Sequence, residues 1–207
     1  MKEYQIKCMD HAPMCCKCWS RIEAVEINEC VWGDAYKPKC TAQVVFVPGD
    51  AFYARLTCEE KNPRAVHGGF YSEVYKDSCL EMFAIWDDQS DRYVNVEMNS
   101  IGASLAAFGP DRYDRTPIDR IIGHPFEVQA DRNENAWSVT VRIPLEDLCT
   151  LYGMSSDKFV PGYVIRGNFY KCGDDCEIAH YIMWNPVETE NPDYHRPEFF
   201  GKMVIGE

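Results

Sequence analysis

The 207-residue sequence has no apolar run of the roughly 20 residues that a membrane-spanning helix needs, so no membrane anchor is expected. The segment Met1–Lys7 lacks the apolar core of a secretory signal. There is no Gly/Ser-rich linker and no internal repeat. Phosphate loops, dinucleotide fingerprints, the Gly-x-Ser-x-Gly elbow and the His-Glu-x-x-His helix are also missing. Since these are the commonest routes to catalysis, we expect a protein that is not an enzyme.

The sequence has fewer basic than acidic residues. Lys and Arg number 21 against 33 Asp and Glu, which gives a net charge of -12. A surface of that sign repels phosphate backbones and anionic lipids, so neither nucleic acid nor a membrane is expected as a partner. Neutral ligands such as sugars are compatible with it, because they are held by hydrogen bonds and ring stacking.

The eleven cysteines are an odd number, and without a secretory signal they indicate reduced thiols in a cytoplasmic protein. Thiolates and an imidazole near the amino terminus would hold zinc if four of them converged, which leaves a zinc-dependent function as an alternative. Their spacing matches no strong zinc signature, so no metal site is predicted there; the residues are Cys8, His11, Cys15, Cys16 and Cys18. Cys172 and Cys176 enclose a turn and offer further zinc ligands or a disulfide.

Short apolar and alternating runs, separated by turn residues, recur along the chain. They predict strands over residues 21–27, 42–47, 52–58, 78–86, 93–99, 104–108, 126–130, 137–143, 163–171, 181–184 and 199–205. Many strands without long helical periods predict an all-β fold, a two-sheet antiparallel β-sandwich of immunoglobulin or jelly-roll type. One short helical turn is expected near 145–150, and a loop over 111–122. Residues 1–18 are expected to pack on this domain as a Cys-rich segment, and residues 19–207 to form the sandwich.

Alternation also indicates which side chains share a face of a strand. In residues 93–99, Glu97 and Asn99 fall on the polar face. In residues 78–86, Glu81 lies among apolar neighbours and needs a partner. Arg166 shares a face with Asn168 in residues 163–171 and is the candidate partner. The alternative is that these groups only line the solvated side of a sheet.

Several motifs occur in a characteristic order. Val74–Phe83 is followed by Tyr93–Asn99 and Gly102, and later by Trp137–Val139 with Ile143-Pro144. Further segments are Arg166–Gly173, Trp184–Pro186 and His195–Gly201. This series resembles the family nine carbohydrate-binding modules, above all their Asp-Ser-x-x-Glu-x-Phe strand pair, and the resemblance covers most of the chain beyond Ile27.

The resemblance implies a β-sandwich that holds sugars, often at a chain end, between aromatic side chains, while carboxylate, amide and basic groups bond the hydroxyls. Glu81 matches the family carboxylate. Tyr75 or Tyr71 stands where family members offer a stacking Trp, and Phe200 takes the second stacking position before the last strand. A basic residue expected in the Tyr93 strand is missing. Members attached to xylanases recognise xylan or cellulose ends, and some bind calcium.

We therefore expect non-catalytic binding of a small saccharide or the end of a plant-type polysaccharide such as xylan or cellulose. The expected ligand-binding residues are Tyr75, Glu81, Glu97, Asn99, Arg166, Asn168, Trp184, His195 and Phe200. Tryptophans in strands are more often core, and Trp137 is assigned there. Alternatives are a protein-interaction sandwich that has lost the sugar site, or a glycoside hydrolase accessory domain that uses Glu81 and Glu97.

No cofactor is required by this interpretation. A calcium ion bound in an acidic loop is compatible with it, the candidate ligands being Asp87, Asp88 and Asp91, although a solvated acidic turn is the simpler explanation. A glycoside hydrolase acting on the same polysaccharide is a candidate partner.

Overall fold

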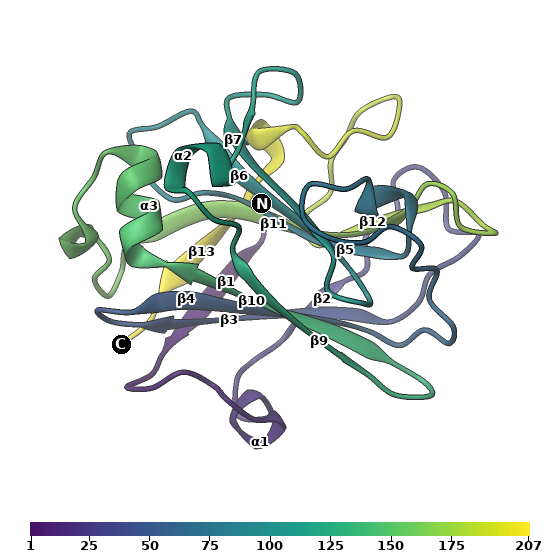
Figure 1. Ribbon diagram of the computed structural model, residues 1–207, viewed down its shortest axis with the longest axis horizontal. Helices are drawn as coiled ribbons and strands as arrows, with labels where there is room; N and C mark the ends of the chain where they lie inside the picture. Colours follow the sequence, from purple (N-terminus) through teal and green to yellow (C-terminus); the bar gives the residue numbers. More distant parts are fainter.

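One continuous, strongly curled 13-stranded sheet builds the protein in the computed structural model, which describes residues 1–207 (Figure 1). The strand order is β8-β7-β6-β5-β11-β13-β1-β3-β4-β10-β9, with β12 also paired to β11 and β2 to β3. The strands are β1 (Glu3–Cys8), β2 (Val25–Ile27), β3 (Cys40–Val47), β4 (Ala51–Cys58), β5 (Cys79–Ile85), β6 (Tyr93–Asn99), β7 (Ser104–Gly109), β8 (Thr116–Pro117), β9 (Glu127–Arg132), β10 (Trp137–Pro144), β11 (Val164–Gly173), β12 (His180–Met183) and β13 (Gly201–Ile205).

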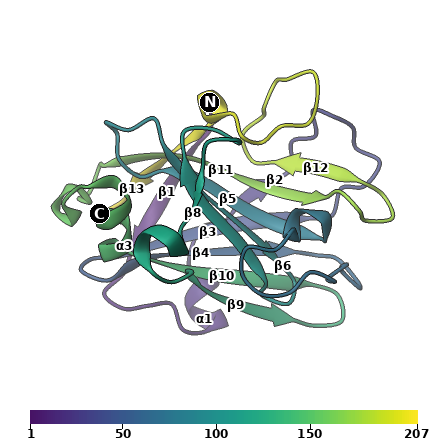
Figure 2. The ribbon, with the colours of Figure 1, turned by 45° about the horizontal axis from the view of Figure 1, so that its top comes forward.

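Strand β1 joins the two halves of this sheet. Glu3–Ile6 pair in parallel with β13, while Lys7 and Cys8 pair in parallel with β3. The curl brings the half that contains β5, β6 and β11 over the half that contains β3, β4 and β10 (Figures 1 and 2). The expected mostly β, sandwich-like architecture is confirmed, but the two separate antiparallel sheets are not: the structure has one mixed sheet. The first 18 residues, expected as a segment packed on the domain, supply this connecting strand.

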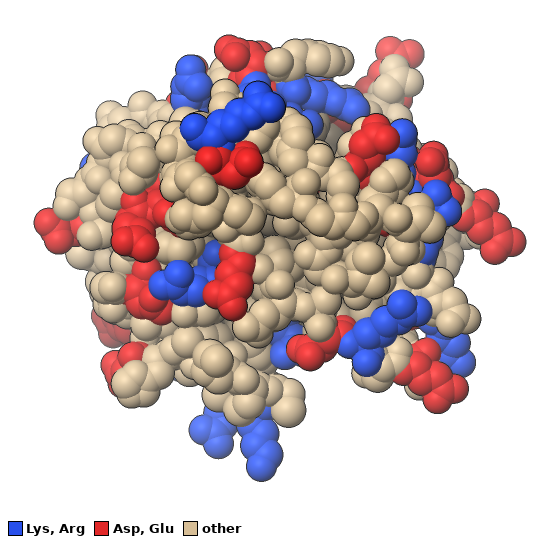
Figure 3. Space-filling view, in the orientation of Figure 1, with Lys and Arg blue, Asp and Glu red and all other residues tan.

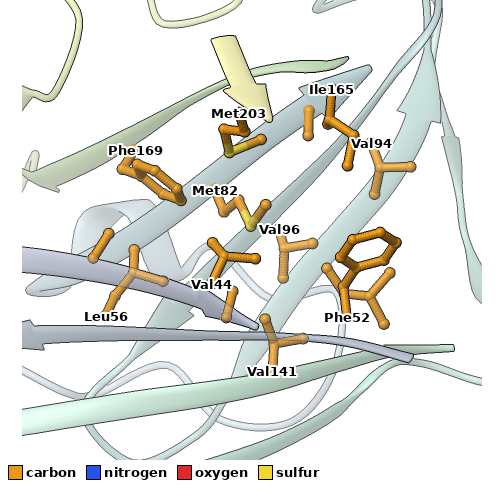
Figure 4. Close-up of a cluster of buried hydrophobic side chains, with 14 of the residues drawn as sticks. Val44, Phe52, Leu56, Met82, Val94, Val96, Val141, Ile165, Phe169 and Met203 are labelled. Carbon is orange, nitrogen blue, oxygen red and sulfur yellow. The ribbon is translucent and has the colours of Figure 1, made fainter. Parts of the chain in front are cut away.

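The main core lies between the two halves. Inward-facing side chains of β5 and β6, such as Met82 and Val96, meet Val44 of β3, Leu56 of β4 and Val141 of β10 (Figure 4). Each of these residues is at most 2% exposed. The strand alternation therefore commits one face of every central strand to the core, and the opposite face remains for other uses.

The helical segments are short. They are α1 (Cys16–Trp19), α2 (Asp119–Ile122) and α3 (Leu145–Tyr152), with 3-10 turns at η1 (Val74–Lys76), η2 (Ser156–Lys158) and η3 (Pro197–Phe199). Helix α3 follows Pro144 and stops at Gly153, whose φ of 65° is readily adopted only by glycine. The turn expected near 145–150 is thus a complete short helix. The expected loop over 111–122 contains β8 and α2. None of the helices has the length and apolar character needed to cross a membrane.

The outer face of β5, β6 and β11 is largely covered as well. All residues of β5, β6 and β7 are buried, although the inner core contacts only alternate side chains. A second apolar cluster on this outer face joins Phe83 and Tyr170 to Tyr194 and Phe200, which come from the segment before β13. This covering segment and the loops beside it leave a cavity over the middle of the strands.

Candidate functional site

The cavity on the outer face of β5, β6 and β11 has a volume of about 470 Å³. Its floor consists of strand residues, and its walls come from η1, the loop between β7 and β8, the β11–β12 hairpin and the segment before η3. Its lining residues are Tyr75, Glu81, Glu97, Arg112, Tyr113, Arg115, Cys172, Asp174, Tyr181, Pro192, Asp193, Tyr194 and His195.

Two carboxylates lie side by side on the cavity floor. Glu81 on β5 is directly opposite Glu97 on β6, and the two residues are 2% and 3% exposed. The Cys172 thiol donates a hydrogen bond to Glu81 Oε1 over 2.9 Å. Burial, followed by the neighbouring Glu97, raises the pKa of Glu81 well above its usual value. The floor thus favours a protonated carboxyl, or a ligand that compensates the charge.

Glu97 has a basic neighbour that comes from a loop. Arg115 Nη1 lies 3.6 Å from Glu97 Oε1, and Asn95 Nδ2 donates to the same oxygen over 3.0 Å. Burial raises the pKa of Glu97 to about 7, although Arg115 opposes that rise. Glu97 Oε2 is buried without a hydrogen-bond partner. An acceptor is therefore available beside the cavity for a donor from outside the chain.

Aromatic side chains form the walls. Tyr113 is 92% exposed, on the loop that links β7 to β8. Asp111 Oδ1 fixes this loop by accepting from the backbone amides of Tyr113 and Asp114 over 2.7 and 2.9 Å, and these bonds lower the pKa of Asp111. Tyr75 and Tyr181 line the cavity from η1 and β12. Such rings provide flat apolar faces with a polar edge.

His195 closes one end of the cavity as a neutral group. Its Nδ1 lies 2.7 Å from the Tyr93 hydroxyl, and its ring packs 4.8 Å from Phe83, measured between centroids. Burial, with a further contribution from Arg115, lowers the pKa of His195 to about 2. The imidazole therefore supplies hydrogen-bonding capacity without a charge at neutral pH.

The structure brings four of the residues expected from the sequence to this cavity: Tyr75, Glu81, Glu97 and His195. The other five do not line it. Asn99 bonds Asp77 Oδ2 over 2.9 Å and the Ala103 amide over 3.1 Å, which ties together the turn after β6. Asn168 is fully buried and bonds the backbone of Asn185 at 2.8 and 2.9 Å.

Arg166 is not the partner of Glu81. It stands opposite Ile85, whereas Glu81 stands opposite Tyr170, and its guanidinium donates to the Pro197 carbonyl over 2.8 Å. The expected pair shares a face of the sheet, but the register separates its members by four positions along β11.

The two aromatic residues near the last strand are also internal. Trp184 is 3% exposed and packs on Phe169 in the main core, with ring centroids 5.5 Å apart. Phe200 is fully buried and meets the edge of Tyr93 at 5.9 Å. Both positions are closed to a ligand, so the aromatic walls come from other parts of the chain.

Sequence reasoning missed Tyr181 on β12 and seven lining residues that the loops supply: Arg112, Tyr113, Arg115, Asp174, Pro192, Asp193 and Tyr194. The available signal was the run Arg112–Arg115, which places one aromatic among charged residues in a stretch expected to be a loop. An aromatic without strand or helix periodicity has no core face to occupy, so a surface role is the natural interpretation.

The other candidate metal ligands from the sequence are dispersed or paired. In the acidic loop, Asp87 Oδ1 accepts from Lys158 Nζ over 2.8 Å. At the amino terminus, Cys15 and Cys18 bring their sulfurs within 3.3 Å, while the Cys8 thiol donates elsewhere, to the Gly206 carbonyl. All eleven cysteines, including Cys176, are free thiols.

A second hollow of about 630 Å³ lies beside α1, against β4, β9 and β10. Its lining includes Trp19 and Arg142, and the Arg142 guanidinium forms an ion pair with Asp50. Across the face shown in Figure 3, acidic and basic side chains are interspersed, without one continuous basic patch.

Comparisons with known proteins agree with this fold. A Bacteroides uniformis ATCC 8492 protein, provisionally assigned as carbohydrate-binding, superimposes with a TM-score of 0.81 at 25% identity over 99% of both chains. A Caldicellulosiruptor kristjanssonii carbohydrate-binding module of family 9 in complex with glucose gives 0.68 at 12% identity, covering 100% of this chain and 97% of that one. The cellotriose complex gives 0.68 at 13% identity, covering 99% and 94%.

A search of curated protein sequences gives no match. The model of Carbohydrate-binding family 9 matches residues 16–205, which is nearly the whole chain. Together with the shared fold, this match shows that the chain belongs to Carbohydrate-binding family 9.

Proposed function

We propose that this protein binds the end of a plant-type polysaccharide or an oligosaccharide, such as xylan or cellulose, in the cavity above Glu81 and Glu97, and does not cleave it. The observation that carries the proposal is the combination of an exposed aromatic wall with a buried polar floor. Tyr113 offers a flat face at the rim, while Glu97 and Arg115 lie below it. Family membership and the saccharides bound by the two Caldicellulosiruptor kristjanssonii complexes support it.

Sugar recognition requires both kinds of surface. The C–H side of a sugar ring packs on aromatic faces, and the hydroxyls need donors and acceptors because their burial without partners is costly. Glu97 Oε2 provides an acceptor that no protein group uses. Arg112 and Arg115 provide donors of the kind that form paired bonds to adjacent oxygens.

The cavity is bounded by η1, the loop between β7 and β8, and the segment before η3. Walls on several sides favour the end of a chain over its middle, because a continuous polysaccharide needs an open groove with two exits. A chain end also offers extra hydroxyls that the floor carboxylates and guanidiniums would bond.

The position of the carboxylates favours binding over hydrolysis. In glycoside hydrolases two carboxyl groups flank the bond that is cut, one on each side of the substrate. Glu81 and Glu97 are neighbours on the cavity floor and stand directly opposite each other on paired strands. The Cβ atoms of such a residue pair are about 5 Å apart. A sugar above the floor would meet both groups from the same side.

Titration calorimetry with glucose, cellotriose and xylotriose tests the proposal. The wild-type protein is expected to bind at least one of them, and Tyr113→Ala to weaken that binding about tenfold through loss of ring stacking. Tyr71→Ala is the matched control, since Tyr71 is 44% exposed and does not line the cavity. Absence of binding by the wild-type protein, or equal affinities for both variants, would refute the proposal.

A further inference from the structure

Two thiols and a carboxylate converge on the cavity floor. The sulfurs of Cys79 and Cys172 and a carboxylate oxygen of Glu81 all lie within 4.8 Å of one another. The three residues are 0%, 2% and 2% exposed. Sugar binding as proposed above gives no role to the thiols.

The strand register places these groups together. Cys79 and Glu81 are two positions apart on β5, so both side chains point to the outer face. Cys172 on β11 stands directly opposite Cys79. Three groups from two paired strands are therefore held on a rigid part of the sheet. This is the kind of support that keeps metal ligands in position.

We propose that Cys79 Sγ, Cys172 Sγ and one oxygen of Glu81 bind a single thiophilic divalent cation, zinc in the first instance, whose fourth position faces the cavity. Zinc prefers thiolate, imidazole and carboxylate ligands in a tetrahedral arrangement. Three protein ligands with one open position would leave the ion accessible to water or to a ligand in the cavity. Glu81 and Cys172 both line that cavity.

A second observation indicates that a cation or a hydrogen-bond donor is missing beside the cavity floor. Glu97, directly opposite Glu81, keeps its Oε2 buried without a partner. A water molecule bound to the cation at its open position would be a donor for an acceptor on this floor. The buried carboxylates and the orphaned oxygen are then explained by one cation.

Zinc binding displaces the protons of both thiols and, where it is protonated, that of the Glu81 carboxyl, so the complex carries a net charge of -1. Arg115, which already contacts Glu97, supplies a compensating positive charge beside the floor.

A second cross-strand thiol pair provides a contrast. Cys40 and Cys58 also stand directly opposite each other, on β3 and β4, and both are buried. They belong to the main core between the two halves of the sheet and line none of the described cavities. No path for an ion or for its water is evident there, so Cys40 serves as a matched control.

The inference goes beyond sugar binding and does not depend on it. The test uses the 207-residue chain carrying Cys15→Ser, Cys16→Ser and Cys18→Ser, so that these amino-terminal thiols, which are exposed or partly exposed, do not contribute zinc binding. This background is loaded with zinc alone, freed of unbound metal by desalting, and assayed for zinc per chain. Cobalt titration then reports thiolate ligation through its charge-transfer absorption.

One zinc per chain is expected in this background and in its Cys40→Ser derivative. Cys79→Ser, Cys172→Ser and Glu81→Gln should each lower zinc affinity at least tenfold, and either Cys→Ser change should weaken the cobalt–thiolate band. Glu81→Gln preserves the size of the side chain, and circular dichroism checks that each variant is folded. The proposal would be overturned if the background protein retained no zinc, or if folded Glu81→Gln and Cys79→Ser retained as much zinc as the background protein. Sugar titration in the presence of a chelator tests the proposed function separately.

Discussion

Glu81 and Glu97 stand directly opposite each other on neighbouring antiparallel strands, and neither is more than 3% exposed. Burial raises the pKa of both carboxyl groups, and the neighbouring Glu97 raises that of Glu81 further. Only Glu97 has a basic neighbour, Arg115. An arrangement that costs stability in the free protein is typical of a binding site, where a ligand compensates it.

Glu81→Gln should therefore stabilise the free protein. The amide removes one of the two opposed acidic groups, and its oxygen still accepts the bond from the Cys172 thiol. We expect the free energy of unfolding at pH 8 to rise by about 1 kcal/mol, measured by chemical denaturation with a chelator present. Glu134→Gln, in the exposed turn between β9 and β10, should leave it unchanged. A less stable Glu81→Gln protein would contradict this account of the floor.

The same substitution should weaken saccharide binding. The raised pKa of Glu81 favours a neutral carboxyl, whose hydrogen bonds to sugar hydroxyls contribute about 0.5 to 1.5 kcal/mol each, so its replacement by an amide is expected to lower affinity by up to about tenfold. Calorimetry with the saccharide bound by the wild-type protein measures the change. If Glu81→Gln binds that saccharide as tightly as Glu134→Gln does, the ligand does not reach the floor.

Trp184 is predicted to act in packing, through its contact with Gly201. A Cβ at Gly201 would lie 2.6 Å from the Trp184 ring and 3.0 Å from the Lys2 carbonyl oxygen. Gly201→Ala should therefore lower the free energy of unfolding by about 1 to 3 kcal/mol, because the core and β1 would have to move. Gly68→Ala, where a Cβ meets nothing within 4 Å, is the control in the same denaturation experiment. Equal stabilities would show that this contact is easily relieved.

The alternation of apolar and polar residues was sufficient to locate the central strands and the two carboxylates of the cavity floor. Tyr93–Asn99 was predicted with its observed bounds, and Glu81 and Glu97 were placed on the faces they occupy. Strand β1 was missed because only Tyr4 and Ile6 are fully buried in it, among exposed polar neighbours. A strand that joins two halves of a sheet gains its stability from pairing that lies far away in the sequence.

The cavity walls depended on tertiary structure that no local pattern encodes. Arg166 shares a face with Tyr170, but only the register decides which of them meets Glu81. Tyr113 reaches the rim because the loop after β7 turns back over the strands. Trp184 was expected at a rim, yet the missing side chain at Gly201 makes room for its ring inside the fold.

His180 is predicted to make the protein less stable in acid. It is 4% exposed; its Nδ1 lies 2.7 Å from the Ile178 carbonyl oxygen, and its Nε2 accepts from Lys171 Nζ. Burial, with the nearby Lys171 charge, lowers its pKa from 6.5 to about 4. Between these values the unfolded chain binds a proton that the folded protein refuses, so stability falls as the pH decreases.

The difference between the two pKa values corresponds to a loss of about 3 kcal/mol in the free energy of unfolding between pH 7 and pH 4. His180→Gln should remove about this much of the decrease in the free energy of unfolding between pH 7 and pH 4. The stability of the variant at pH 7 separately measures the effect of losing the contact between His180 and Lys171. His11→Gln, which removes an exposed imidazole, should keep the wild-type dependence. Denaturant titrations at several pH values measure all three proteins. Parallel curves for His180→Gln and the wild type would show that the pKa of His180 is not lowered in the folded protein.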